Sequence, residues 1–369
     1  MKPKIIIDAL ALLGPLTGIG RYTYENAKIL KSSEYFQIDY FYGYVSDKLM
    51  APSHAAGTKS LRLWIIKNPL IKSIVRSILF KISGMMAKRY DLYWQPNFIP
   101  NHSIKADKII VTVHDFSWEI YPEFQPTERV TYFQKYFYSS LQKCDHIITG
   151  SEFTKIEIIE RTGFDPNKVS VIYHGIDHTV FYPRLEIQKP IQKYILAVGS
   201  IEPRKNLKNL LSAYAKLDQK SKNEYHLILV GSSGWNNDDI LQNMKSLSQW
   251  VFYSGYVTDE KLAELYSNAS LFIYPSVYEG FGIPPLEAMA CGTPVICSDS
   301  SSLPEVGGDA VVYCNPYDVE DIKEKITLVL DDEDLQETMI KKGLERAKMF
   351  SWDKSAEQHL EIFKKVVVK

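Results

Sequence analysis

Two carboxylates flank a glycine loop in the stretch YEGFGIPPLE, residues 278–287, which follows the apolar run LFIYPS after a single residue. The carboxylates are Glu279 and Glu287, and the loop between them holds Gly280 and Gly282. Glycine lets a backbone approach a ligand closely, because it has no Cβ atom. Carboxylates accept hydrogen bonds from hydroxyl groups. The stretch therefore combines hydroxyl acceptors with a backbone that a ligand can approach.

The same stretch predicts the start of a helix. Pro284 and Pro285 suit the first turn, where backbone N–H groups lack intrahelical acceptors, and Gly292 suits the C-terminal end. We expect Glu287 in the first turn and Glu279 in the loop before it. Free N–H groups at a helix start bind anions, so the whole stretch fits a sugar nucleotide. A glycine turn and a helix start that bind nothing would have the same sequence features.

A pair of basic residues follows another apolar run. In AVGSIEPRKNLKNLL, Arg204 and Lys205 lie at a predicted strand-to-helix turn. Two cations beside a helix N-terminus suit a diphosphate, because arginine can bond it through two N–H groups. Their charges would also stabilise a departing nucleotide. Two solvated surface cations are an equally good interpretation of these residues taken alone.

Three further motifs give weaker signals. PLTGIGRYTYE places Gly18 and Gly20 before a predicted helix, in a G-x-G pattern that a plain tight turn also explains. VTVHD places His114 at the end of a strand, where a histidine is more often structural. In GYVTDE, Tyr256 and Val257 offer backbone groups to a nucleobase, or pack at an edge.

Short apolar runs alternate with helical patterns along the chain. Continuous Val, Ile and Leu runs separated by helices indicate parallel strands that are buried on both faces. The runs form two series, KIIIDAL with 108–113, 146–149 and 169–172, and then 194–198, 226–230, 271–274 and 294–297. The predicted fold class is α/β, with two doubly wound Rossmann-like domains, parallel sheets and an interdomain cleft.

The linker between these domains is polar, marked by prolines and without periodicity. It covers residues 181–193, so the predicted domains are 1–180 and 194–351. The last stretch, 352–369, is an amphipathic helix. Its periodicity alone leaves open whether it completes the second domain or returns to the first, and we expect it on the first.

Composition excludes several classes of protein. A chain of 369 residues is too long for one ordinary core, and 45% hydrophobic with 24% charged residues is typical of globular enzymes. A formal net charge of -1 gives no general attraction to nucleic acid. The four cysteines form no CxxC pair, so we expect reduced thiols in a cytoplasmic protein. Asp8 interrupts the apolar N-terminus, and no run is long enough to span a membrane.

EGFGIPPLE followed by EAMACGTPVICSD resembles the E-x7-E motif of family 4 glycosyltransferases, which are retaining enzymes with the two-domain fold called GT-B. GIGRY, VHD, SEFTK, GSIEPRKN and GYV occur in the order expected for that family, so the resemblance covers nearly the whole chain. The chain looks like the mannosyltransferase-type members that build bacterial surface polysaccharides. His174, in YHGID, stands where relatives commonly carry Asn, a departure that concerns only a turn contact.

The resemblance implies a role for each part of the motif. Glu287 would accept hydrogen bonds from the ribose hydroxyls, and Glu279 would lie near the transferred sugar. The backbone N–H groups expected to reach the hydroxyls of that sugar are those of Gly280, Phe281 and Gly282. The amide of Ile283 would contact the distal phosphate. Arg204 and Lys205 would bind the diphosphate.

The remaining motifs receive roles in the same way. The resemblance places Gly18 and Gly20 near the donor phosphates and the acceptor, and His114 beside the 6-hydroxyl of the donor sugar. Tyr256 and Val257 would contact the nucleobase. Retaining enzymes of this type are thought to use front-face attack, in which the leaving phosphate takes the acceptor proton, so His114 is not assigned as a general base. No metal or other cofactor is expected.

The predicted reaction is transfer of a hexose with retention of anomeric configuration. Its predicted donor is GDP-mannose, and its predicted acceptor is a polyprenyl-linked oligosaccharide or polysaccharide precursor. A UDP-sugar-dependent transferase of the same fold is an alternative. A sugar-nucleotide 2-epimerase is a weaker one, because the E-x7-E spacing and PRKN argue against it. A non-catalytic sugar-nucleotide-binding module conflicts with the full set of site residues.

One segment concentrates positive charge. Residues 48–90 contain nine Lys or Arg and no Asp or Glu. Within them, residues 70–82 predict an amphipathic helix with basic residues opposite an apolar stripe. Such a helix can lie on an anionic membrane surface, which would suit a lipid-linked acceptor at the inner leaflet of the plasma membrane. An ordinary helix with its stripe on the domain core is the alternative.

Overall fold

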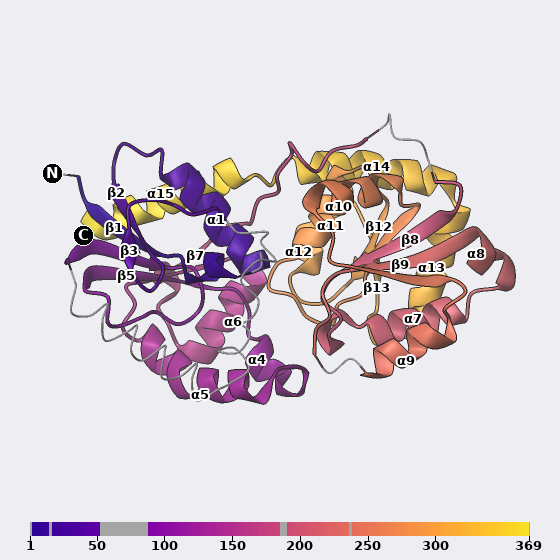
Figure 1. Cartoon of the computed structure of the whole chain (residues 1–369), viewed down its shortest axis with the longest axis horizontal. Coiled ribbons are helices and arrows are strands. Elements are labelled where there is room, and N and C mark those ends of the chain that lie inside the picture. The colour runs from indigo at the N-terminus through magenta and orange to yellow at the C-terminus, as the bar shows by residue number, and fades with distance from the viewer. Residues whose placement is uncertain (1, 15–16, 52–87, 185–189, 236–237, 369) are drawn as a thin grey trace.

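The computed structural model describes residues 2–14, 17–51, 88–184, 190–235 and 238–368. Within these ranges the chain forms two α/β domains, one after the other (Figure 1). Each domain has a central sheet with helices packed against it. The fold class predicted from the sequence, two Rossmann-like domains, is confirmed.

The strands of the first domain form one sheet in the order β3-β2-β1-β4-β5-β6-β7. Their bounds are β1 Lys4–Asp8, β2 Gln37–Phe41, β3 Val45–Ser46, β4 Tyr90–Gln95, β5 Ala106–Val113, β6 His146–Thr149 and β7 Val169–Val171. Neighbouring strands run parallel except β2 and β3, which are antiparallel at the sheet edge. Ile5, Ile6 and Ile7 are all buried, as expected for a central strand covered on both faces.

The second domain has a sheet in the order β10-β9-β8-β11-β12-β13, with every neighbouring pair parallel. Its strands are β8 Lys193–Val198, β9 Tyr225–Val230, β10 Val251–Gly255, β11 Leu271–Tyr274, β12 Val295–Ser298 and β13 Val312–Cys314. The strand order turns back beside β8, because β9 and β10 extend the sheet on one side of it and β11 to β13 on the other. Loops that leave two such neighbouring strands diverge and make room for a ligand.

Helices connect the strands and cover the sheets. In the first domain they are η1 Leu10–Leu13, α1 Gly18–Leu30, α4 Ser117–Ile120, η2 Pro122–Phe124, α5 Thr127–Leu141, α6 Glu152–Thr162 and η3 Pro166–Lys168. Those that follow are η4 Pro203–Lys205, α7 Leu207–Ala215, α8 Gln219–Glu224, α9 Asp238–Ser246, α10 Asp259–Asn268, α11 Ile283–Ala290, α12 Leu303–Gly307, α13 Val319–Asp331, α14 Glu333–Ala347 and α15 Trp352–Val368.

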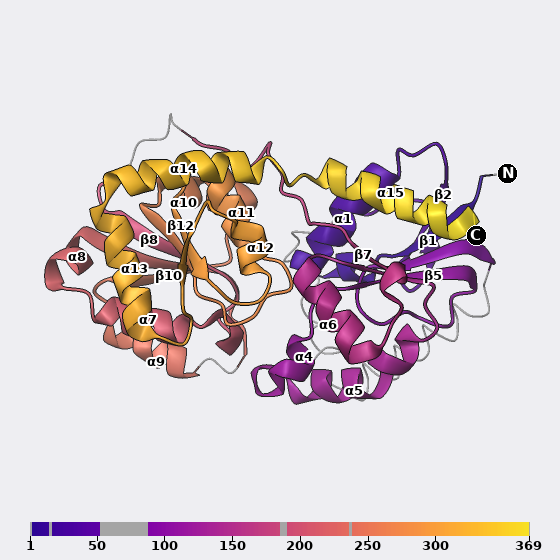
Figure 2. The ribbon, with the colours of Figure 1, turned by 180° about the vertical axis from the view of Figure 1, so that it is seen from behind.

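The C-terminal helix α15 lies on the first domain, beside α1, in both views (Figures 1 and 2). Trp352, Ala356 and Phe363 are buried in the same cluster as Ile5 and Ile7. The chain therefore passes between the domains twice, once before β8 and once between α14 and α15. The second passage ties the end of the chain to the core of its beginning.

Several strands have no counterpart among the predicted apolar runs. These are β2, β3, β4, β10 and β13. The strand β4 reads YDLYWQ and β10 reads VFYSG, so aromatic and polar residues replace the Val, Ile and Leu that marked the others. The antiparallel β3 also departs from the expected parallel sheet.

The basic helix predicted at 70–82 lies outside the described residues. In the part of the chain that is described, no helix is long and apolar enough to cross a membrane.

Candidate active site

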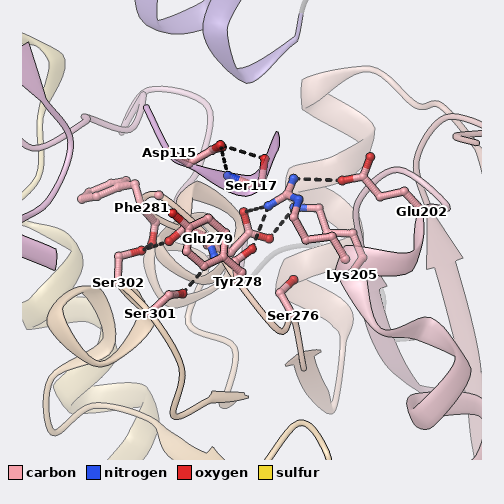
Figure 3. A network of polar contacts seen from close by, with 12 residues as sticks. Asp115, Ser117, Glu202, Lys205, Ser276, Tyr278, Glu279, Phe281, Ser301 and Ser302 are labelled. Carbon is pink, nitrogen blue, oxygen red and sulfur yellow. Dashed lines mark hydrogen bonds and ion pairs between the residues drawn. The ribbon is translucent and has the colours of Figure 1, made fainter. Parts of the chain in front are cut away.

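Glu279 is bonded to both cations of the PRKN turn, and Figure 3 shows the polar network around it. Arg204 donates from Nη1 to Oε2 of Glu279 at 2.6 Å, and Lys205 donates from Nζ to Oε1 at 2.6 Å. Tyr274, the last residue of β11, donates its hydroxyl to Oε1 at 2.9 Å. These residues meet because β8 and β11 are neighbours, with Leu271 opposite Ile195, so the loops after the two strands lie side by side. The point where the strand order turns back is thus occupied by an ion cluster.

Burial strengthens this cluster. Glu279 is 7% exposed, and the side chains of Arg204 and Lys205 are 15% and 12% exposed. Burial alone would raise the pKa of Glu279, but the charges of Arg204 and Lys205 outweigh it and lower the pKa to about 2. Burial lowers the pKa of Lys205, although Glu279 opposes that shift. Glu279 is therefore a carboxylate at any ordinary pH.

Glu202, which the sequence patterns did not single out, holds the other side of Arg204. Its Oε1 accepts from Nη2 of Arg204 at 2.8 Å, and Glu202 is only 3% exposed. Arg204 also donates from Nη1 to the carbonyl oxygen of Tyr278 at 2.9 Å. Its Nε is buried without a hydrogen-bond acceptor among the described residues. The only local signal for Glu202 is its place in the same EPRK turn.

In the EGFG loop the carbonyl groups of Gly280 and Phe281 accept hydrogen bonds from side chains, whereas the N–H groups of Gly280, Phe281 and Gly282 donate none within the described part of the chain. The carbonyl oxygen of Gly280 accepts from Ser151 Oγ at 2.8 Å, and that of Phe281 accepts from Ser302 Oγ at 2.7 Å. Among the described residues, none accepts a hydrogen bond from the backbone N–H of Gly280, Phe281 or Gly282. Gly282 has a φ of 124°, which glycine adopts without strain, and leads directly into α11. The loop therefore presents unpaired donors at a helix N-terminus, where anions and hydroxyls bind.

Glu287 lies in the second turn of α11 and not in the first, because the helix begins at Ile283. It is 5% exposed, and Tyr266 donates its hydroxyl to Oε2 at 3.2 Å. Burial raises the pKa of Glu287 to about 7, and the positive charge of Arg21 offsets this only in part. Arg21 comes from α1 of the first domain and donates to Asp259 of the second at 2.6 Å. Glu287 is thus a buried acceptor that changes charge near neutral pH.

The first domain contacts the EGFG loop directly. A Cβ atom on Gly280 would lie 1.8 Å from the carbonyl oxygen of His114, so only glycine fits this contact. Tyr278 accepts a hydrogen bond from the backbone N–H of Phe116 at 2.9 Å and donates to Glu157 at 2.6 Å. Burial raises the pKa of Glu157 to about 7. Both domains therefore shape the surroundings of Glu279.

The imidazole of His114 packs between Tyr22 and Phe98, with ring centroids 5.1 and 5.3 Å away. Its Nε2 lies 2.8 Å from the carbonyl oxygen of Pro96, and burial lowers its pKa. The residue thus meets the EGFG loop through its carbonyl group. His174 is more than a turn residue, because it is 7% exposed and its ring lies 5.8 Å from that of His114. Its Nδ1 has no hydrogen-bond partner among the described residues.

The other predicted residues lie on different elements. Gly18 and Gly20 are inside the first turn of α1 and not before it, since Thr17 caps that helix through a 3.2 Å bond from Gly20 N to its Oγ1. Tyr256 and Val257 lie between β10 and α10, and Tyr256 is 58% exposed. Within the described residues, neither pair shares a hydrogen bond with the ion cluster.

Together these groups suit a ligand that is both anionic and rich in hydroxyls. Two buried cations can neutralise charge that grows on a phosphorylated leaving group. The unpaired amides and the two glutamates supply donors and acceptors on the same side of the second sheet. Among the described residues, no cluster of three or more His, Cys, Asp or Glu has the arrangement of a metal site.

Comparison with known proteins places this site in a family. A sequence model described as Glycosyltransferase Family 4 matches residues 17–180, and one described as Glycosyl transferases group 1 matches residues 185–346. The O-antigen chain mannosyltransferase B of Escherichia coli is 35% identical over 98% of this chain and 99% of its own. Sucrose-phosphate synthase from Thermosynechococcus elongatus shares the fold with a TM-score of 0.76 over all of both chains, at 20% identity. Anabaena Alr3699/HepE in complex with UDP and glucose gives a TM-score of 0.71 over 98% of this chain and 100% of its own, at 16% identity.

The fold and these matches define a glycosyltransferase with the GT-B architecture. Within that class, the chain belongs to the glycosyltransferase family whose two sequence models cover its two domains. It resembles a mannosyltransferase of O-antigen synthesis along its full length. The family and the enzyme class predicted from the sequence are thereby confirmed.

Proposed function

We propose that this enzyme transfers mannose from GDP-mannose, with retention of configuration, to a glycan precursor carried on a polyprenyl diphosphate. The observation that carries the proposal is the full-length similarity to an O-antigen chain mannosyltransferase, at 35% identity. The buried cation pair beside a helix N-terminus supports a nucleoside diphosphate leaving group. The retention and the lipid carrier come from the family resemblance and from the basic segment.

The structure supports a specific arrangement of the donor. Arg204 and Lys205 neutralise the diphosphate, and the N–H groups of the EGFG loop and of Ile283 bind its distal end and the sugar. Glu287 accepts hydrogen bonds from the ribose. Its buried carboxyl accepts one hydrogen bond from the hydroxyl of Tyr266, and its other lone pairs can accept more. Glu279 accepts hydrogen bonds from the transferred sugar.

The proposed chemistry needs no protein base. The acceptor hydroxyl attacks the anomeric carbon on the face from which the diphosphate departs, and a phosphate oxygen takes the acceptor proton. The glycosidic bond forms while the bond from the anomeric carbon to the phosphate oxygen breaks. Arg204 and Lys205 stabilise the charge that accumulates on the leaving phosphate.

A UDP-sugar donor is the second candidate, because a protein of the same fold has been crystallised with UDP and glucose. Thermal unfolding with GDP-mannose, UDP-glucose, UDP-galactose and UDP-N-acetylglucosamine separates the two, since a ligand of the folded state raises its stability. We expect GDP-mannose to give the largest rise in melting temperature. The variant Arg204→Ala should bind it about tenfold or more weakly, because a charge-assisted hydrogen bond is lost.

A turnover assay then tests whether the bound donor reacts. We expect release of GDP that depends on added lipid-linked acceptor, which distinguishes a transferase from a 2-epimerase and from a binding module. Stabilisation by a UDP-sugar alone would replace the proposed donor. Absence of stabilisation by every sugar nucleotide tested would refute the proposal.

We also propose that turnover is independent of metal, because the two cations can do the work of a divalent ion at the diphosphate. Activity should survive dialysis against EDTA at its original rate. A loss that added Mg²⁺ or Mn²⁺ reverses would contradict this.

We place the reaction at the cytoplasmic face of the plasma membrane, on the basis of the charge of residues 48–90, most of which lie outside the described residues. Each basic residue near an anionic surface contributes about 1 kcal/mol to binding. Flotation with anionic vesicles should carry the protein upward, and reversing Lys67, Lys72, Arg76 and Lys81 to Glu should abolish this. Equal flotation with neutral vesicles, or none with either kind, would refute the membrane association and leave the transfer site unaffected.

A further inference from the structure

The cations proposed to bind the diphosphate already share one carboxylate in this structure. Arg204 Nη1 and Lys205 Nζ each lie 2.6 Å from a different oxygen of Glu279. The two oxygens of one carboxylate therefore take the same two N–H donors that phosphate oxygens would use. Those two N–H donors become available to a diphosphate only when the Glu279 side chain moves away.

The charge of the cluster leads to the same conclusion. Arg204 and Lys205 are balanced by Glu202 and Glu279, and all four side chains are at most 15% exposed. A donor diphosphate adds further negative charge. If both carboxylates stayed, the surplus would be buried and unpaired, which is strongly unfavourable. One carboxylate has to move away when the donor binds.

Glu279 is the carboxylate placed to move. Its N–H donates to Ser301 Oγ at 2.8 Å and its carbonyl oxygen accepts from Ser302 Oγ at 2.8 Å, so its backbone is fixed and only the side chain needs to rotate. It also adjoins the unpaired N–H groups of the EGFG loop, where the sugar hydroxyls are proposed to bind. Glu202 bonds Nη2 of Arg204, whereas Glu279 bonds Nη1, so Glu202 can keep the guanidinium oriented throughout.

We infer that Glu279 is an internal competitor for the Arg204–Lys205 pair, displaced by the donor diphosphate and returning when the nucleoside diphosphate leaves. The inference rests on the proposed function and concerns the regulation of the same site. A complete donor offers Glu279 new hydrogen bonds from its sugar hydroxyls, whereas the product nucleotide does not. The exchange therefore weakens binding of the product more than binding of the donor, and it favours product release.

The test uses inorganic pyrophosphate and free GDP and UDP as probes, because none of them contains the transferred sugar. Calorimetric titration of the full chain at about pH 8 compares wild type with Glu279→Gln, which keeps the size of the side chain and removes its charge. We expect Glu279→Gln to bind pyrophosphate about tenfold or more tightly than wild type. Its affinity for the complete sugar nucleotide should rise much less, because the sugar loses a charged acceptor.

Glu202→Gln is the matched control, since it removes the same charge beside the same arginine. A simple gain of positive potential would strengthen pyrophosphate binding equally in both variants, and that result would overturn the exchange. Unchanged or weaker binding to Glu279→Gln would overturn it too. If Glu279→Gln does not fold, Glu279→Ser replaces it, because water can then solvate the cations, and the rise in melting temperature with pyrophosphate gives the same comparison. Wild type that binds pyrophosphate but no sugar nucleotide would instead refute the proposed function.

Discussion

We expect donor binding by the wild-type enzyme to depend on pH, and replacing Glu287 by Gln should remove that dependence. Burial raises the pKa of Glu287 to about 7, so the residue titrates near neutral pH. Ribose hydroxyls donate hydrogen bonds, and an ionised carboxylate accepts them more strongly than a protonated carboxyl does. At about pH 6 roughly one Glu287 in eleven is ionised, so the wild-type Kd should be about tenfold higher there than at about pH 8.

The assay is calorimetric titration with the sugar nucleotide across this pH range. Both phosphates of a sugar nucleotide are esterified, whereas the terminal phosphate of a free nucleotide titrates near about pH 6 and would obscure the effect. Wild type should also release a proton on binding below about pH 7. The Kd of Glu287→Gln should be higher than that of wild type at high pH, and it should not change with pH. A flat wild-type profile, or the same slope in Glu287→Gln, would refute the assignment of Glu287 to the ribose.

The same pKa shift acts on stability. The pKa of Glu287 in the folded state, about 7, exceeds its ordinary value of 4.5, so the folded protein binds more protons than the unfolded chain between these values. The free energy that this proton uptake adds to the stability of the fold is fully present below about pH 4.5 and is lost as the pH rises through about 7. The melting temperature of Glu287→Gln should therefore fall less over that range than the melting temperature of wild type does. Some decrease should remain in the variant, because burial also raises the pKa of Glu157 to about 7.

Two further predictions concern the packing around the site. Gly280→Ala should lower kcat by about tenfold or more and also weaken donor binding, because its Cβ would lie 1.8 Å from the His114 carbonyl oxygen, the loop N–H groups proposed to bind the sugar would have to shift, and overpacking of this size costs about 1–3 kcal/mol. Gly14→Ala is the control, since its Cβ would meet no atom of the described residues within 4 Å; equal kcat in both variants would contradict the argument. Phe363→Ala should destabilise the first domain by about 3–5 kcal/mol in denaturant titration, because this fully buried ring packs 5.4 Å from that of Trp94. An unfolding midpoint like that of the exposed-site control Lys365→Ala would show that α15 adds nothing to that core.

Local sequence patterns predicted much of the fold because central parallel strands need apolar side chains on both faces. The runs at β1, β5, β8 and β11 meet that demand with Val, Ile and Leu, and each was recognised. The edge strand β10 has three exposed residues in its middle, so no apolar run marks it. In β4 the buried positions carry Tyr, Leu and Trp next to Asp91, and hydrogen bonds of the aromatic hydroxyl and indole groups replace pure apolar packing.

The site could be predicted only in part, for a related reason. Glu279 and Arg204 were each recognised from the glycine or proline pattern around them, which reports a local turn. Their direct bond could not be predicted, because it depends on β8 pairing with β11 across about seventy-five residues of chain, a pairing that periodicity does not encode. Glu202 and Glu157 were missed because an isolated acid in a sequence carries no sign of what it will be buried against.

Hydrogen bonds between the domains show that both of them shape the one candidate site. The EGFG loop belongs to the second domain, yet the hydroxyl that holds the Gly280 carbonyl comes from Ser151 at the start of α6 in the first. The second domain likewise binds backbone groups of the first, because Glu305 accepts hydrogen bonds from the backbone N–H groups of Glu152 and Phe153 and so caps α6. Each domain thus satisfies backbone groups that the other leaves open. Ser151 of the first domain and Ser302 of the second therefore fix the loop together, and the N–H groups proposed to bind the sugar are oriented in part by the contact between the domains.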